Sequence, residues 1–178
     1  MRLIYAIALL PALALISGCS IGATKAEKPK AVALTEEAAG HYCQMTILEH
    51  EGPKAQAHLA GLLAPLWFSQ VRDGLAYLKS PEQSAELLIL YVNDMGAAKS
   101  WAEPGIENWI DANAAYFVVG SDAIGGMGAP ELVPFSDQNT AKEFAGTRGG
   151  EVMRLSEIPV ELVLSPVEFD EGTLEHTQ

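Results

Sequence analysis

Apolar residues recur along this chain with two different periods, and the changes of period divide it into short elements. In the stretch FSQVRDGLAYLKS, Val71, Leu75 and Leu78 have the i, i+4, i+7 spacing of one face of a helix. Ser69 precedes them as a candidate N-cap, and Pro81 is expected to end the helix. The pattern therefore predicts an amphipathic helix here.

The segments on both sides of this helix have the features of strands. Residues 41–48 (HYCQMTIL) and 55–63 (AQAHLAGLL) are predicted to pair as a hairpin around the turn residues EHEGPK. Residues 85–94 (AELLILYVND) form a short apolar run followed by turn residues, which is typical of a buried strand. The first half of the chain is thus predicted to be strand, strand, helix, strand.

The second half repeats this order. Phe68 and Ser69 before the first helix are matched by Phe135 and Ser136 before the second. The predicted elements of the second half are a strand (113–121), a glycine-rich loop (GGMGAP), a strand (131–135), a helix in SDQNTAKEFAG capped by Ser136 or Asp137, and a strand (150–158). We predict an α+β protein of two similar ββαβ units, residues 39–95 and 96–160, packed together because neither can bury a core alone.

The first residues indicate export. An apolar run follows Arg2; it has the length of a signal sequence and is short for a membrane span. The run ends in ISGC, which resembles a lipobox, so residues 1–18 are predicted to be removed and Cys19 to be lipidated. Several acyl chains would hold the protein on a membrane, and Ser20 favours the outer membrane, facing the periplasm. Residues 19–38 are predicted to be a flexible tether, and residues 161–178 an acidic mobile tail.

Charge and motifs exclude several classes of function. The chain has 23 acidic and 11 basic residues, a net charge of −12, and no basic cluster, which argues against nucleic-acid binding. The sequence has no Ser-His-Asp arrangement, phosphate-binding loop or zinc-ligand spacing, so we expect that the protein is not an enzyme.

The stretch HYCQM holds the most distinctive chemistry. Once Cys19 is lipidated, Cys43 has no partner for a disulfide in the chain. On a strand, His41, Cys43 and Met45 would share a face in steps of about 6.6 Å, close enough for Cys43 and Met45 to bind one ion, with His41 a weaker candidate. A thiolate and a thioether favour Cu(I) over Zn²⁺ or Ca²⁺. Packing in the core is the alternative role for both residues.

HYCQM followed by ILEHEGPKAQ, and the later GGMGAPELVPF, resemble the NosL family over about residues 38–160. The resemblance implies two ββαβ units like part of organomercurial lyase, although a lone thiol, Cys43, argues against lyase activity. It places Cys43 and Met45 on the copper-binding element and Met127 on a second motif. For the third ligand, His50, His41 and His58 remain alternatives to Met127.

The same resemblance implies a role in denitrification. Members of the family are understood to be periplasmic Cu(I) chaperones that work with an ABC-type maturation complex and supply copper to apo nitrous oxide reductase. A different hypothesis is a metal-free interaction module that docks other periplasmic proteins through Trp67, Trp101 and Trp109.

Overall fold

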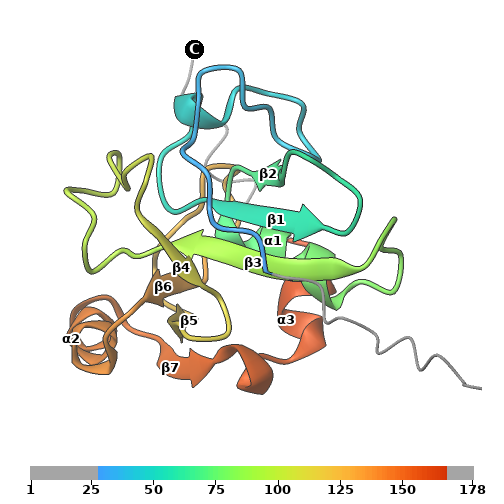
Figure 1. Ribbon diagram of the computed structural model, residues 1–178. Coiled ribbons are helices and arrows are strands. Elements are labelled where there is room, and N and C mark those ends of the chain that lie inside the picture. Colours follow the sequence, from blue (N-terminus) through green and yellow to red (C-terminus); the bar gives the residue numbers. More distant parts are fainter. Residues whose placement is uncertain (1–27, 168–178) are drawn as a thin grey trace, which may run out of the picture.

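The computed structural model describes residues 28–167, which form two small antiparallel sheets with helices beside them (Figure 1). The predicted signal peptide, the lipidation site Cys19 and residues 168–178 lie outside this part of the chain. No helix within residues 28–167 is long and apolar enough to cross a membrane.

Each sheet contains one ββαβ unit, in which the first strand lies between the other two. The first sheet also includes a strand at residues 109–111, so the predicted boundary between the units at residues 95 and 96 was wrong. The first sheet has the order β2-β1-β3-β4 and the second has the order β6-β5-β7. The first sheet consists of β1 (Ala55–Leu59), β2 (Leu66–Phe68), β3 (Leu87–Asn93) and β4 (Trp109–Asp111), with α1 (Val71–Lys79) between β2 and β3. The second consists of β5 (Tyr116–Val119), β6 (Val133–Phe135) and β7 (Glu151–Arg154), with α2 (Gln138–Arg148) between β6 and β7. The predicted α+β fold of two ββαβ units is confirmed.

Helix α1 packs on the first sheet as its sequence pattern predicts. Val71 and Leu75 are buried in the main core. Gly74 lies so close to β1 that an added Cβ would be 2.6 Å from the Cβ of Ala55. The predicted cap was wrong, because the N-cap residue is Gln70 and not Ser69, and the Gln70 side chain makes no capping bond.

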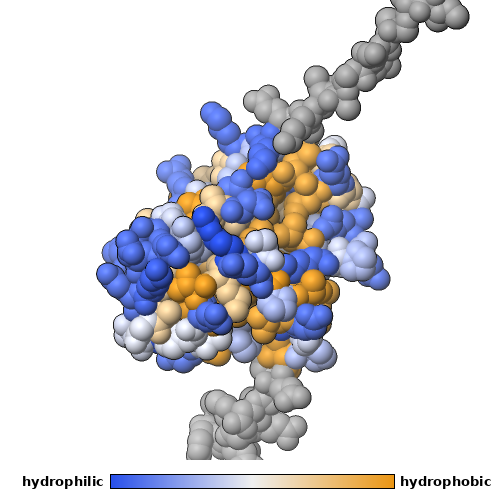
Figure 2. Space-filling view, turned by 90° about the horizontal axis from the view of Figure 1, so that it is seen from below, coloured by the Kyte–Doolittle hydropathy of each residue, from blue (hydrophilic) through white to orange (hydrophobic). Residues whose placement is uncertain are grey.

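Helix α2 begins as the sequence predicts. Asp137 is the N-cap, and its Oδ1 accepts hydrogen bonds from the backbone N–H groups of Asn139 and Thr140. Ser136, the other candidate, bonds to Asp94 instead. Of the helix, only Ala141 is buried, so α2 is a mostly exposed element (Figure 2 shows its side of the molecule as hydrophilic).

The predicted strand at residues 41–48 does not form. The Gln44 N–H bonds to the Gly40 carbonyl at 2.8 Å, and the Gly40 N–H bonds to the Met45 carbonyl at 2.9 Å, which closes a tight turn. Gln44 has a φ of 58°, and its side chain donates to the Gly40 and His41 carbonyls, which holds this left-handed conformation. A short 3₁₀ helix, η1 (Ile47–Glu49), follows, and the place beside β1 is taken by β2, which pattern reasoning missed.

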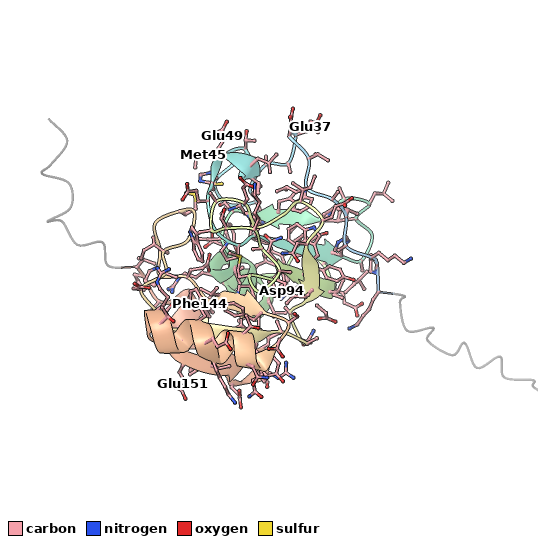
Figure 3. All side chains as sticks on the ribbon, turned by 90° about the vertical axis from the view of Figure 1, so that its left-hand side faces the viewer. Glu37, Met45, Glu49, Asp94, Phe144 and Glu151 are labelled. Atoms are coloured by element: carbon pink, nitrogen blue, oxygen red, sulfur yellow. The ribbon has the colours of Figure 1, made fainter. Side chains whose placement is uncertain are left out.

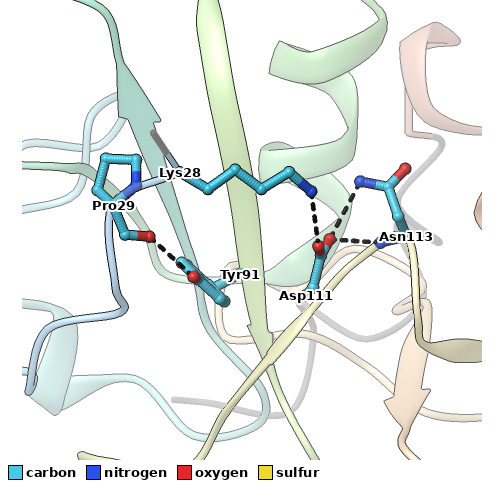
Figure 4. A network of polar contacts seen from close by, with 5 residues as sticks. All are labelled: Lys28, Pro29, Tyr91, Asp111 and Asn113. Carbon is cyan, nitrogen blue, oxygen red and sulfur yellow. Dashed lines mark hydrogen bonds and ion pairs between the residues drawn. The ribbon is translucent and has the colours of Figure 1, made fainter. Parts of the chain in front are cut away.

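The predicted tether was wrong for residues 28–38, because they lie on the first sheet; residues 19–27 lie outside the described residues. The Tyr91 hydroxyl donates to the Pro29 carbonyl at 2.8 Å, and Lys28 forms an ion pair with Asp111 at 3.2 Å (Figure 4). Farther along, the backbone of Val32 exchanges two hydrogen bonds with the Gln56 side chain. This segment covers the face of the sheet opposite α1.

The predicted tail also begins too early. Residues of α3 (Val160–Leu164) pack against α1, with Val163 buried. Arg72 donates to the Ser165 carbonyl at 3.0 Å. The preceding strand β7 ends at Arg154, and η2 (Leu155–Glu157) replaces the rest of the predicted strand. Helix α3 has only five residues, which is too few to show a helical period in the sequence.

Candidate metal centre

Cys43 lies in the turn at one end of the molecule, half-exposed and with a free thiol. Its Sγ is 3.6 Å from the Oγ of Ser69, which directly follows β2. A Cβ on Gly40 would collide with this sulfur, so the glycine leaves the room that the thiol occupies. Cys43 is therefore partly exposed, and its thiol contacts the start of α1.

Met45 lies in the same turn, and its side chain is exposed. Figure 3 shows it at one end of the molecule, near Glu49 and Glu37 and far from Phe144 and Glu151. Cys43 and Met45 do not share the face of a strand as predicted, because the turn at Gln44 lies between them. Both sulfur-bearing residues nevertheless belong to one short surface segment.

Met127 lies in a glycine-rich loop that packs against the same corner of the structure. Its backbone N–H donates to the Gln70 Oε1 at 3.2 Å. A Cβ on the neighbouring Gly126 would be 2.8 Å from the Ser69 carbonyl oxygen. The structure thus places the Met127 loop on Ser69 and Gln70, at the corner that the Cys43 thiol contacts.

The three candidate histidines have different surroundings. His50 faces the Met127 loop: its Nδ1 is 2.9 Å from the Gly126 carbonyl oxygen, and its buried Nε2 has no hydrogen-bond partner. The His41 ring makes a tilted contact with Tyr42 and edge-on contacts with Phe68 and Tyr77.

His58 is on β1, with its Nε2 2.9 Å from the Gln56 Oε1, and burial lowers its pKa. It belongs to the face of the sheet that residues 28–34 cover. Of the three histidines, His50 is the one next to the predicted ligand loop.

Two buried charged residues lie behind this site. Glu131 is 2% exposed, and burial raises the pKa of its carboxyl to about 7. Lys54 is also 2% exposed and donates to the carbonyls of Glu51 and Gly52, and burial lowers its pKa to about 8. Both residues hold backbone groups of segments that surround the site.

Sequence patterns did not predict the supporting roles of these residues. Ser69 was predicted only as a helix cap, and Gln70 and Glu131 were not singled out. Glu131 begins the predicted strand ELVPF, where a charged residue among apolar ones is the only available signal. Hydrogen bonds over 57 and 60 positions of the chain have no signature in local spacing.

The available donors restrict the kind of metal that the site can bind. Within residues 28–167, no three His, Cys, Asp or Glu side chains are grouped as a metal site would require. An open hollow of about 580 Å³ lies beside His50 and Gly126, and Glu49 and Glu51 are among its lining residues. A metal centre with three or more ligands on Cys43 would therefore need methionine sulfur or a ligand from a partner, and methionine sulfur suits a soft ion.

The fold and this corner define a small α+β protein in which, among residues 28–167, one partly exposed thiol lies next to methionine-bearing loops. The chain belongs to the NosL family, whose family model matches residues 31–163. It is 53% identical over 158 residues to the copper-binding lipoprotein NosL of Achromobacter cycloclastes, covering 88% of this chain and 81% of that protein. It is 34% identical to the copper-binding lipoprotein NosL of Stutzerimonas stutzeri, covering 88% and 80%.

A solved structure agrees with the fold. The crystal structure of the copper chaperone NosL from Shewanella denitrificans matches with a TM-score of 0.68 and 33% sequence identity. The match covers 72% of this chain and 95% of that one. The family expected from the sequence motifs is therefore confirmed, whereas the individual ligands stay predictions.

Proposed function

We propose that this protein is a Cu(I) chaperone that binds one copper ion through Cys43, Met45 and Met127. The observation that carries the proposal is the position of the Cys43 thiol, which is accessible and touches Ser69 where the Met127 loop also packs. Thiolate and thioether sulfur are the donors that select Cu(I). His50, with an unpartnered Nε2, is the alternative to Met127 as third ligand.

The exposure of this site suits transfer of the ion. Cys43 is half-exposed and Met45 is exposed, so a partner's ligand can reach the metal before the protein releases it. A site with few protein ligands leaves a coordination position for that exchange. The net charge of −12 and the acidic side chains near His50 would also favour the approach of a cation.

The cellular role that we propose rests on the family. The relatives are named copper-binding lipoproteins and a copper chaperone. We infer that Cys19 is lipidated and holds the domain on the outer membrane, facing the periplasm. From there it supplies copper to apo nitrous oxide reductase together with an ABC-type maturation complex.

A metal-free docking module has less support. The rings of Trp67 and Trp109 lie 5.7 Å apart and pack against the small core of Leu34 and Ile47. Trp101 lies over Gly52, where an added Cβ would be 2.9 Å from its ring. All three tryptophans thus have packing roles.

Anaerobic titration of Cu(I) against a colorimetric chelator tests the proposal. We expect one Cu(I) per chain for the unchanged protein. Substitution of a residue that only supports a metal ligand typically weakens binding by roughly 10–100-fold. Cys43→Ser should weaken Cu(I) binding by more than that, because it removes a ligand. Met45→Leu and Met127→Leu, which preserve side-chain volume, should each weaken it less. Met153→Leu is the matched control, because Met153 packs against the main core and should leave the affinity unchanged.

Two results would count against the proposal. Unchanged stoichiometry and affinity in Cys43→Ser would remove the proposed thiolate ligand. Failure of the unchanged protein to compete with the chelator at all would favour the metal-free module.

A further inference from the structure

The first turn of α1 has an unusual arrangement of hydrogen bonds. An N-cap side chain normally accepts a bond from an N–H in the first turn of its own helix. Gln70 holds the N-cap position without doing so. Its Oε1 accepts from the Met127 N–H at 3.2 Å, and its Nε2 donates to the Asp73 Oδ1 at 2.9 Å. The side chain therefore links the Met127 loop to the Asp73 side chain in the first turn of α1, without capping a backbone N–H of the helix.

Glu131 supplies the cap that Gln70 does not. Its two carboxylate oxygens accept from the N–H groups of Val71 and Arg72, at 3.1 and 2.9 Å. Its own segment is fixed as well, because Oε1 also accepts from the Leu132 N–H at 2.9 Å. Glu131, which follows the Met127 loop, is thus bound to the start of α1. Gln70, at the same helix start, holds the Met127 backbone.

Packing leaves this loop little freedom to move. A Cβ on Gly125 would be 2.7 Å from the Gln70 Oε1 and 2.7 Å from the Glu131 Oε2. The loop backbone thus fits between the two side chains. On the other side of Gln70, Ser69 contacts the Cys43 thiol. Two consecutive residues therefore touch both proposed parts of the metal centre.

We propose that Gln70 is a positioning residue that holds the Met127 loop beside Cys43 and so directs the Met127 sulfur to the bound Cu(I). This inference rests on the proposed function, and it adds a residue that does not itself contact the metal. Without the Gln70 oxygen, the Met127 N–H loses its partner, and the Met127 backbone is held less firmly at this corner.

A double-mutant cycle tests this role, with Gln70→Leu and Met127→Leu alone and combined. Gln70→Leu should weaken Cu(I) binding by about 10-fold, as expected for a residue behind a ligand. In the Met127→Leu background the same change should have no further effect. X-ray absorption of Cu(I)-loaded Gln70→Leu should show one sulfur scatterer fewer than the unchanged protein, a signature that loss of stability alone would not produce.

Gln138→Leu is the matched control, because Gln138 is an exposed glutamine at the start of the other helix. It should leave the affinity and the spectrum unchanged. If Gln70→Leu proves too unstable to study, Gln70→Ala removes the same acceptor with less apolar bulk and carries the same expectation.

The possible failures can be told apart. The positioning role is overturned if Met127→Leu weakens binding and Gln70→Leu does not, or if the two losses simply add; the proposed function survives both outcomes. If Met127→Leu has no effect, Met127 is not a ligand and the positioning role fails with it. If Cys43→Ser also has no effect, the proposed function itself fails.

Discussion

The two helices occupy equivalent places in the two ββαβ units, yet they begin in different ways. Helix α2 follows β6 and is capped by its own neighbour, Asp137. Helix α1 follows β2 and is capped by Glu131, 60 residues along the chain from Val71. Helix α1 also buries one face against the core, whereas α2 buries only Ala141.

This difference shows that equivalent helices in the two units are capped by different means. The topology is the same in both units, so the fold does not require a distant cap. In the first unit, the side chain of the N-cap residue Gln70 holds the Met127 loop. The buried carboxylate of Glu131 accepts the hydrogen bonds of the helix N-terminus in its place. Places where a local rule fails are often functional, and this one adjoins the Cys43 thiol.

Removal of the distant cap should have the largest effect on stability. Glu131→Ala leaves three backbone N–H groups without their acceptor, those of Val71, Arg72 and Leu132. Because an unsatisfied buried donor costs about 1 kcal/mol or more, we expect a loss of about 3 kcal/mol. Urea unfolding followed by circular dichroism measures this. A loss below that of Asp137→Ala would contradict the difference between the two caps.

The two capping carboxylates should give opposite pH dependences of the free energy of unfolding. Burial raises the pKa of Glu131 to about 7, so its contribution is fully present below pH 4.5 and is lost as the pH rises through 7. The stability advantage over Glu131→Gln should fall by about 2 kcal/mol between pH 5 and pH 7.5.

Asp137 provides the internal comparison. Hydrogen bonds from Thr140 lower its pKa, so its contribution is present above its ordinary value of 3.8 and is lost as the pH falls. The advantage over Asp137→Asn should shrink toward pH 3. Denaturant unfolding at a series of pH values checks both trends, and parallel profiles for the two variants would contradict them.

Two glycine substitutions test the contrast between the surroundings of the two helices, because Gly126 packs on Ser69 beside α1 and Gly146 lies in α2. A Cβ on Gly126 would be within 3 Å of the Ser69 and Glu51 carbonyl oxygens, so Gly126→Ala should destabilise the protein by about 1–2 kcal/mol and weaken Cu(I) binding. Gly146 lies exposed in α2 with nothing near it, so Gly146→Ala should stabilise by up to about 1 kcal/mol. Thermal unfolding and Cu(I) titration of both variants test this; equal shifts in the same direction would be the contrary result.

The local cap of α2 should give the smallest effect. Asp137→Ala removes bonds to the N–H groups of Asn139 and Thr140 at an exposed helix end. We expect a loss of about 1 kcal/mol with no change in Cu(I) affinity. A loss of copper binding would show that α2 is coupled to the metal site after all.

The sequence predicts the repeated topology well and the site only in part. The α1 face and the α2 cap are visible in the sequence because they depend on neighbours a few residues apart. The strand predicted for residues 41–48 fails because the Gln44 side chain stabilises a left-handed turn, which alternation of apolar residues does not reveal. Glu131 and Gln70 act over long separations, so only the folded chain shows what they do.

We propose that Cys43, Met45 and Met127 together bind one Cu(I). X-ray absorption of the Cu(I)-loaded protein tests it most directly, because it distinguishes sulfur from nitrogen and oxygen scatterers. We predict three sulfur scatterers in the unchanged protein and two in Met127→Leu. A spectrum dominated by nitrogen or oxygen, or one that Cys43→Ser leaves unaltered, would contradict the account.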